Sequence, residues 1–435
     1  MKAFTEPLLS LAGFEEMTKT AEKSSGLISV TGCIDAQKSQ MIYAFGGHRK
    51  NKLIVTFGEQ KARELYDEYS FFDKEVVYYP SKDVLFYQSD IRGNLLTAER
   101  IRALKAIREQ ERVTLVTTFD ALMNTMAPIE KMWENVLTLE QGQLLDLKEI
   151  QAALIRMGYE KEYQVQTMGQ FSVRGGILDV FPLTEENPIR IELWGDEIDT
   201  IRYFDCESQK SIENTDRVSI YPAAELVLSD EEKAGGIDKL KAEAKRVSDK
   251  LRKQMKTEEA HRVTVMADEL TEEWGELSMY AGMDAFLSYF FDERVGLLDY
   301  FKPSDSLIFF DELTRCTEQG KLTETEFSES MKQRLAMGYI LSGQMNGLFT
   351  EKEIVAKLGK YSCIALAALD NKANGLHQLG SYGIHCQSVS PYNNSFELLI
   401  KDLKRYKKNG YRVILLSGSR TRAKRLSEDI TDQGI

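Results

Sequence analysis

The stretch that decides the fold lies near the N-terminus, where residues 27–39 read LISVTGCIDAQKS. An apolar run that predicts a strand leads into a loop and a helix, and the loop follows most of the phosphate-binding pattern G-x-x-x-x-G-K-[ST]. Gly32, Lys38 and Ser39 match this pattern, whereas Gln37 occupies the position of its second glycine. That glycine lets backbone amides close around phosphates in a conformation that a Cβ atom disfavours. One position therefore decides whether the loop is an ATPase site or the remnant of one.

The composition limits the classes of protein to which the chain can belong. Its 435 residues predict two to four domains, and the absence of an 18-residue apolar run or an N-terminal apolar segment excludes a membrane span and a signal peptide. Five scattered cysteines and four histidines without ligand spacing indicate a reduced, cytoplasmic protein with neither disulfides nor a metal site. Because the net charge is −12, any contact with nucleic acid has to be local.

Strand and helix signals alternate from residue 26 to about residue 128. This rhythm predicts an α/β domain in which helices cover a parallel sheet, as in nucleotide-binding domains. The predicted strands are 27–31, 52–57, 75–79 and 113–118. One predicted helix follows the loop and ends at Phe45, and the others span 60–71, 98–109 and 120–126.

The pattern changes near residue 135, where we expect a small α+β module inserted into the first domain. Asp146 followed by Glu149 predicts the start of a helix, which Gly158 ends. Strands are then expected at 176–181, 189–194 and 198–205, and Gly195-Asp196 predicts a tight hairpin between the last two.

The rest of the chain combines a charged helix with further α/β signals. Residues 230–256 predict a solvated helix, and the apolar strand 307–310 ends in Asp311-Glu312. From about residue 355 we expect a second small α/β domain, of which only the beginning is present. It comprises a helix from Phe396 to Tyr406, a strand at 411–416 and a helix at 420–429, and we expect the chain to be the N-terminal part of a longer protein.

Two interpretations of the loop compete. In the functional one, Lys38 contacts the phosphates of ATP, Ser39 holds Mg²⁺, and Asp311 and Glu312 form the acidic pair that coordinates the metal and orients water. In the other, the loop is a βα turn without a ligand. The missing glycine favours the second interpretation, so we expect no ATP hydrolysis by this segment and no cofactor bound to it.

The hairpin of the module carries a second candidate site. Two-residue periodicity places Ile189, Ile191 and Leu193 on one face, and Arg190, Glu192 and Trp194 on the other. A tryptophan beside an arginine on an outer sheet face is typical of a protein-binding hot spot, and Arg174 lies just before the neighbouring strand. The alternative is that Trp194 folds under the turn while Arg190 pairs with Glu192. Residue spacing leaves both open.

Basic residues also gather near the C-terminal end, in two predicted helices. Solvation of these faces is the simpler interpretation, and contact with nucleic acid is the alternative. The residues concerned are Lys404, Arg405, Lys407, Lys408, Arg420, Arg422, Lys424 and Arg425.

These motifs together resemble a known family. The segments RGGILDVFP (174–182), RIELW (190–194) and DEI (196–198) resemble domain 2 of the excision-repair helicase UvrB and its counterpart in the transcription-repair coupling factor (Mfd). LLDYF at 297–301, before the strand that ends in Asp311-Glu312, continues the likeness over nearly the whole chain. UvrB has an intact phosphate loop and a long aromatic hairpin after its third strand. Here Gln37 interrupts the loop, and only Tyr79–Tyr87 and a short loop precede the helix at 98, so the N-terminal UvrB-like half of Mfd is the better match.

The resemblance implies a fold and a set of boundaries. It predicts a degenerate RecA-like sheet domain of the P-loop helicase type at 1–132 and a UvrB domain 2-like module at 133–222. A domain 1b at 223–354 and the incomplete α/β domain at 355–435 would follow, before the polymerase-interacting and translocase domains.

The resemblance also implies a function. It predicts a non-catalytic region that recruits UvrA to RNA polymerase stalled at DNA lesions, with Arg174, Arg190 and Trp194 as the UvrA contacts. Trp194 is a phenylalanine in the best-known members. RNA polymerase, double-stranded DNA and the ATP- and Mg²⁺-dependent motor would involve regions beyond this segment, and no membrane is involved. The alternatives are an active UvrB-type helicase subunit and a scaffold without a repair partner.

Overall fold

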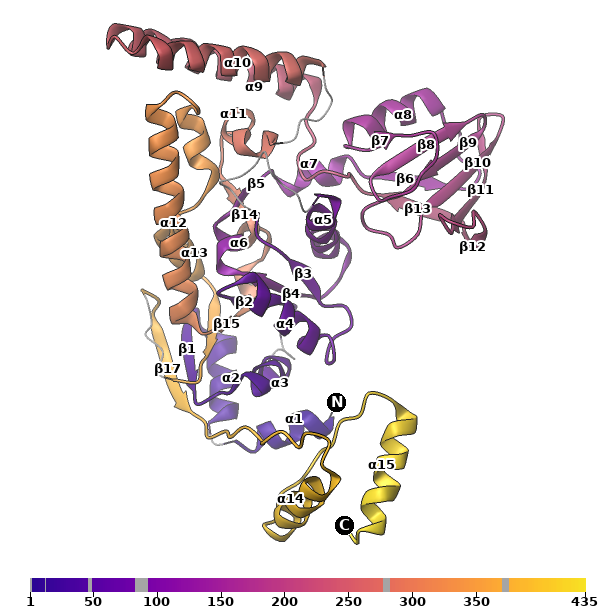
Figure 1. Cartoon of the computed structure of the whole chain (residues 1–435), viewed down its shortest axis with the longest axis vertical. Helices are drawn as coiled ribbons and strands as arrows, with labels where there is room; N and C mark the ends of the chain where they lie inside the picture. The colour runs from indigo at the N-terminus through magenta and orange to yellow at the C-terminus, as the bar shows by residue number, and fades with distance from the viewer. Residues whose placement is uncertain (1, 12, 46–48, 83–92, 277–281, 370–374) are drawn as a thin grey trace. The chain divides into compact units, whose positions relative to one another are not determined.

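The computed structural model of the chain describes residues 2–11, 13–45, 49–82, 93–276, 282–369 and 375–435. Its contacts divide the chain into two units, Met1–His385 and Cys386–Ile435. The first unit contains a large parallel sheet, an inserted module and a helical hairpin (Figure 1). The second contains two helices, α14 (Phe396–Lys408) and α15 (Arg420–Asp432).

The seven-stranded sheet has the order β17-β1-β16-β15-β2-β4-β3, and all its neighbouring strands are parallel. Both faces of its central strands β1, β4, β15 and β16 are buried, as expected for strands made of continuous apolar runs. Along β2, Leu53 and Val55 face one core while Ile54 faces the other. The strands are β1 (Gly26–Thr31), β2 (Asn51–Thr56), β3 (Val77–Tyr79), β4 (Val113–Thr118), β15 (Ser306–Asp311), β16 (Ser362–Leu366) and β17 (Gln378–Gly383).

Helices pack on both faces of this sheet. One core combines strand residues with Met17, Met41 and Leu65 from helices near the N-terminus, and the other with Leu104 and Leu358. The first set of helices comprises α1 (Lys2–Leu9), α2 (Phe14–Lys23), α3 (Asp35–Phe45) and α4 (Glu59–Tyr69). The second comprises α5 (Gly93–Glu109), α6 (Phe119–Met123), α12 (Leu313–Ala336) and α13 (Glu351–Leu358).

The module is a six-stranded sheet covered by one helix. Asp146 caps the helix by accepting hydrogen bonds from the backbone amides of Lys148 and Glu149. A separate two-stranded ladder, β6 with β13, brings the entry and exit of the module together. The elements are β6 (Leu137–Glu140), α8 (Leu147–Arg156), β7 (Glu160–Lys161), β8 (Gln170–Arg174), β9 (Ile177–Val180), β10 (Ile189–Trp194), β11 (Glu197–Phe204), β12 (Ser211–Thr215) and β13 (Arg217–Ile220).

Between the module and β15 the chain forms a helical hairpin and short elements. Ser229 and Glu232 form a capping box that starts the first long helix of the hairpin. The elements are α9 (Asp230–Lys253), α10 (Thr257–Glu276), 3₁₀ turns at Met283–Phe286, Leu297–Tyr300 and Pro303–Asp305, α11 (Leu287–Phe290) and β14 (Val295–Gly296). A further 3₁₀ turn, Ser342–Gly347, follows α12. β14 pairs with β5 (Thr125–Met126), which α7 (Ile129–Glu134) follows.

The structure confirms the predicted α/β class, with its large parallel sheet and the inserted α+β module with its hairpin at Gly195-Asp196. Two expectations need correction. The chain does not begin a new unit at residue 355, because β16 pairs with β1 and β15 inside the large sheet. The expected strand at 411–416 is not formed either: these residues lie in the described part of the chain, pair with no strand and leave their apolar side chains exposed. The comparison of Tyr79–Tyr87 with the UvrB hairpin lies largely outside the described residues.

Candidate functional site

The sheet of the module separates an apolar face from a polar one. Ile189 and Ile191 of β10 are buried in a core with Leu178 of β9 and Leu154 of α8. Leu193 is half-buried against the same core, as its place in the alternation predicts. Because side chains alternate along each strand, Arg190, Glu192 and Trp194 project from the opposite side. This opposite side is called the polar face below.

Strand register aligns charged residues across the polar face. Arg190 lies directly opposite Asp179 on β9 and opposite Arg202 on β11. Asp179 in turn lies opposite Ser172 on β8. Directly opposed side chains in antiparallel strands are close enough to interact, so the register places Asp179 beside Arg190.

Asp179 is the buried centre of this arrangement. Arg190 donates two hydrogen bonds to it, from Nε to Oδ1 at 2.7 Å and from an Nη to Oδ2 at 2.9 Å, and Arg174 donates a third at 2.8 Å. The Asp179 side chain is 1% exposed, that of Arg190 13% and that of Arg174 35%. The hydrogen bonds from Arg190 to Asp179 raise the pKa of the guanidinium. Both arginines are therefore held in place by a single carboxylate.

Other contacts fix the remaining side of Arg190. Its guanidinium donates to the side-chain oxygen of Gln209 at 2.9 Å and lies 4.3 Å from the ring centre of Phe204. Glu192 does not pair with Arg190. It accepts instead from Arg202, at 3.0 Å for one of the two hydrogen bonds. The predicted alternative, in which Arg190 pairs with Glu192, is wrong, because Arg190 donates to Asp179 and Glu192 accepts from Arg202.

Trp194, at the end of β10, is 85% exposed. The alternative in which it folds under the turn is therefore wrong as well. Gly195 takes a positive φ of 67° in the two-residue turn that follows, as the hairpin requires. A tryptophan that leaves its ring in water forgoes burial worth about 2–3 kcal/mol, which makes the ring available to a partner.

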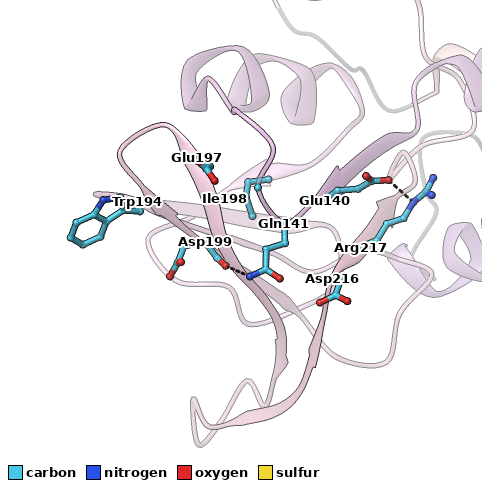
Figure 2. Close-up of a pocket in the computed structure, with 9 residues that line it drawn as sticks. Glu140, Gln141, Trp194, Glu197, Ile198, Asp199, Asp216 and Arg217 are labelled. Atoms are coloured by element: carbon cyan, nitrogen blue, oxygen red, sulfur yellow. Dashed lines mark hydrogen bonds and ion pairs between the residues drawn. The ribbon is translucent and has the colours of Figure 1, made fainter.

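A hollow of about 700 Å³ lies beside Trp194 on the module. Figure 2 shows the indole at one end of it, pointing outward, with Gln141 in its middle. Gln141 donates to the backbone carbonyl of Asp199 at 2.7 Å, and Arg217 pairs with Glu140 at 3.3 Å. The carboxylates around the hollow belong to Glu140, Glu197, Asp199 and Asp216.

Sequence reasoning missed several residues of this site. Asp179 has no signal of its own, because the loop between β9 and β10 is too long to fix their register. Tyr163 follows β7 and is 84% exposed, and its carbonyl accepts a hydrogen bond from Ser172 Oγ of β8. The signal in the sequence that could have identified Tyr163 is an aromatic residue within a polar loop. Tyr163 therefore adds a second exposed ring next to the strand that carries Arg174.

The loop near the N-terminus forms a second candidate site, at the carboxyl edge of the large sheet. Lys38 of α3 is 1% exposed and pairs with three carboxylates. Its Nζ lies 2.9 Å from Asp35 and 3.0 Å from Glu312, and it donates a hydrogen bond to Asp311. Burial disfavours the charged ammonium, but attraction to Asp311 and the three hydrogen bonds outweigh it and raise the pKa of Lys38. The structure thus brings Lys38, Asp311 and Glu312 together, as the functional interpretation of the loop predicts.

Gly32, Gln37 and Ser39 complete the geometry of the loop. Ser39 donates to Glu68 of α4 at 3.3 Å rather than to the acidic pair. Gly32 has a positive φ of 78°, and a Cβ there would clash with the carbonyl of Ile384. Gln37 lies within α3, which begins at Asp35. In this structure the ammonium of Lys38, which would face the phosphates of ATP, is paired with carboxylates of the same chain.

Comparisons with known proteins match the module to a protein family and most of the chain to curated relatives. Residues 137–226 match the sequence model of the UvrB interaction domain. The chain is 26% identical over 384 residues to the transcription-repair-coupling factor of Bacillus subtilis, covering 88% of this chain and 32% of that protein. It is also 26% identical over 435 residues to that of Staphylococcus aureus strain MRSA252, covering 97% of this chain and 35% of that protein. The chain spans about a third of the length of the curated relatives it matches. No helix in the described part of the chain is long and apolar enough to cross a bilayer.

Proposed function

We propose that this chain, which resembles the N-terminal region of a transcription-repair-coupling factor over nearly its whole length, is a docking region that recruits UvrA through the polar face of its module. One observation carries the proposal: β10 carries the exposed ring of Trp194 and, four residues earlier, Arg190, which a buried carboxylate holds in place together with Arg174. All three residues lie within the segment that matches the UvrB interaction domain. The role belongs in the cytoplasm, where repair of transcribed DNA takes place in bacteria.

The chemistry of the polar face supports a protein partner. Tryptophan and arginine are the residues that most often dominate binding energy at protein interfaces. Arg174 keeps about a third of its side chain in water and uses only one Nη for Asp179, so the rest of its guanidinium can reach a partner's carboxylate. Arg190 is more buried, and its main contribution is a fixed positive charge. A face already ordered before binding loses less side-chain entropy on association.

The loop supports a non-catalytic role for this region. ATP hydrolysis needs a lysine free to contact the phosphates and a hydroxyl that reaches Mg²⁺. Lys38 is instead enclosed by Asp35, Asp311 and Glu312, and Ser39 donates to Glu68. We propose further that other regions of the whole protein contact RNA polymerase and drive movement along double-stranded DNA with ATP.

The decisive experiment is a pull-down of UvrA by the whole chain. A triple variant, Arg174→Ala/Arg190→Ala/Trp194→Ala, should lose binding, whereas Leu322→Ala, which removes an exposed apolar side chain of α12, should retain it. Equal capture by the wild-type chain and the triple variant would refute the site. No capture by the wild-type chain would favour a scaffold that lacks this partner.

A second candidate function is an active UvrB-type ATPase. The approach of Lys38 to Asp311 and Glu312 favours it, since these are the residues that such a site would use. Stimulation of ATP hydrolysis by DNA in the isolated chain would establish this second function and overturn the first.

A further inference from the structure

The helical hairpin formed by α9 and α10 carries a charge pattern that docking to UvrA does not use. The two helices lie along each other (Figure 1) and share an apolar seam that includes Leu240, Ala244 and Val263. Ser248 Oγ donates to the carbonyl of Ala260 at 3.1 Å across this seam. The seam fixes which side of α9 faces the solvent.

The solvent side of α9 is strongly basic over its second half. Between residues 241 and 253 the helix has two acidic residues. One of them, Glu243, is buried and accepts hydrogen bonds from Tyr289 and Ser342, which leaves Asp249 as the exposed one. The basic side chains, all exposed and called the basic stripe below, are those of Lys241, Lys245, Arg246, Lys250, Arg252 and Lys253.

The basic stripe lacks close acidic partners in the part of the chain that the structure describes. Within the described residues, no side chain of the basic stripe forms an ion pair, whereas Lys239 of the same helix pairs with Asp292 at 3.0 Å. Like charges four residues apart, as in Lys241 with Lys245 and Arg246 with Lys250, each destabilise a helix by about 0.2–0.5 kcal/mol. The helix dipole favours cations only in the last turn. It therefore explains Lys250, Arg252 and Lys253 but not the three basic residues before them.

The shape of this side suits a linear ligand. A hollow of about 500 Å³ runs along it, lined by Ala242, Lys245, Arg246, Asp249, Lys250 and Lys253. The small side chain of Ala242 leaves room between longer basic ones. At a rise of 1.5 Å per residue, the basic stripe is roughly 18 Å long. That length corresponds to about five steps of a DNA strand at 3.4 Å each.

We propose that the basic stripe of α9 binds the phosphate backbone of double-stranded DNA. Closely spaced basic side chains on one side of a helix complement the regularly spaced phosphates of a duplex. The contact is independent of DNA sequence, because lysine and arginine side chains on an exposed helix face reach phosphates rather than base edges. The net charge of −12 confines the contact to this stripe, since the chain as a whole repels DNA.

The test measures binding of a fluorescent 30-base-pair duplex to the whole chain by anisotropy, at salt concentrations between about 50 and 200 mM. With three to four phosphates neutralised, the logarithm of the affinity should fall with the logarithm of salt at a slope of about −3. The variant Lys245→Glu/Arg246→Glu/Lys250→Glu should bind at least about tenfold more weakly and lose most of this slope. Circular dichroism checks that the variant folds, and Lys245→Gln/Arg246→Gln/Lys250→Gln replaces it if it does not.

A matched control has the same change in net charge elsewhere. Lys332→Glu/Lys352→Glu/Lys360→Glu reverses three exposed basic residues outside both basic clusters and should leave the affinity within about twofold of wild type. The proposal is overturned if the wild-type chain shows no salt-dependent binding, if the control loses as much affinity as the α9 variant, or if polyglutamate competes as well as unlabelled duplex. Capture of UvrA should be unchanged in the α9 variant, which separates this proposal from the docking role.

Discussion

The guanidinium of Arg190 is joined to the buried carboxylate of Asp179 by two hydrogen bonds, at 2.7 and 2.9 Å. A fork-to-fork pair of this kind fixes the plane of the guanidinium as well as its position. Since Arg174 shares the same carboxylate, Asp179 controls the geometry of the polar face without being exposed itself.

Replacement of Asp179 should therefore affect both stability and docking. Asp179→Ala leaves two arginines without their acid, and we expect a loss of about 2–4 kcal/mol in the free energy of unfolding. This loss is at the low end for a broken buried pair, because both guanidiniums stay partly exposed to water. UvrA capture should fall in the folded protein as well. Chemical denaturation and pull-down measure the two effects. Glu192→Gln, which weakens the more exposed pair with Arg202, is the control and should cost about 1 kcal/mol or less; an equal cost would contradict the central role of Asp179.

Changes at Trp194 should separate binding from folding. Because the ring is 85% exposed, Trp194→Ala should change the free energy of unfolding by about 0.5 kcal/mol or less. If the ring is a hot spot, the same variant should weaken UvrA binding by at least about 2 kcal/mol, or roughly thirtyfold. Trp194→Phe keeps an aromatic side chain and should retain most of the affinity. Calorimetric titration with UvrA checks this series, and an alanine variant that binds like wild type would exclude Trp194 from the interface.

Restoring the missing glycine should not restore nucleotide binding. In Gln37→Gly the loop regains its pattern, but Lys38 stays enclosed by Asp35, Asp311 and Glu312. We expect no measurable binding of ATP with Mg²⁺, together with a loss of up to about 1 kcal/mol in stability from a glycine inside α3. Titration with a fluorescent ATP analogue measures the first effect. Micromolar affinity in the variant would show that Gln37 alone had closed the site.

Lys38 should instead prove important for folding. Lys38→Met removes the cation that Asp311 faces in a buried position, where Thr56 Oγ1 donates to it at 3.0 Å. An uncompensated buried carboxylate costs about 3–5 kcal/mol, which urea denaturation can detect. Lys61→Met is the matched control, because Lys61 pairs with the exposed carboxylate of Asp35 and should contribute about 1 kcal/mol or less. If the two variants are equally stable, Lys38 is not a structural lysine.

The limits of sequence-based prediction are visible at the Gly195-Asp196 hairpin. The turn residues and the alternating apolar pattern predict the pairing of β10 with β11, and the structure confirms it. A regular hairpin with this turn would place Arg190 opposite Ile201. The structure has a register shift after Glu192, which moves Arg202 opposite Arg190. No local signal marks this bulge, so the partners of both arginines could not be predicted.

The pairing of strands that are far apart in the sequence could not be predicted either. β16 lies in the range 355–435, which the sequence assigns to a separate domain, but its pairing with β1 joins residues more than 300 positions apart in the chain. A domain boundary at 355 groups β16 with the residues that are near it in the sequence. A strand buried on both faces instead takes its neighbours from distant parts of the chain. The apolar run at 411–416 shows the opposite error. Hydrophobicity predicted a strand there, but a strand also needs a hydrogen-bonded neighbour, and none is present in the described residues.

Stability in acid should depend on Glu225, which follows β13 at the exit of the module. Arg100 of α5 donates to both of its carboxylate oxygens, at 2.7 and 3.1 Å, and Lys82 Nζ lies 3.0 Å from it. Burial alone would raise the pKa of Glu225, but attraction to Arg100 and Lys82 outweighs it and lowers the pKa from 4.5 to about 2. A carboxylate with a depressed pKa stabilises the fold above its unfolded pKa and loses that contribution as the pH falls through its folded pKa.

The free energy of unfolding should therefore fall by a few kcal/mol between about pH 4.5 and pH 2 through this group. Urea denaturation as a function of pH measures the effect. Glu225→Gln should be less stable than wild type at pH 7, because it leaves Arg100 buried without its acid, and should show a shallower decline in acid. Glu140→Gln, which removes an exposed carboxylate from a surface pair with Arg217, is the control and should keep the wild-type profile. Parallel pH profiles for wild type and Glu225→Gln would show that the acid sensitivity arises elsewhere.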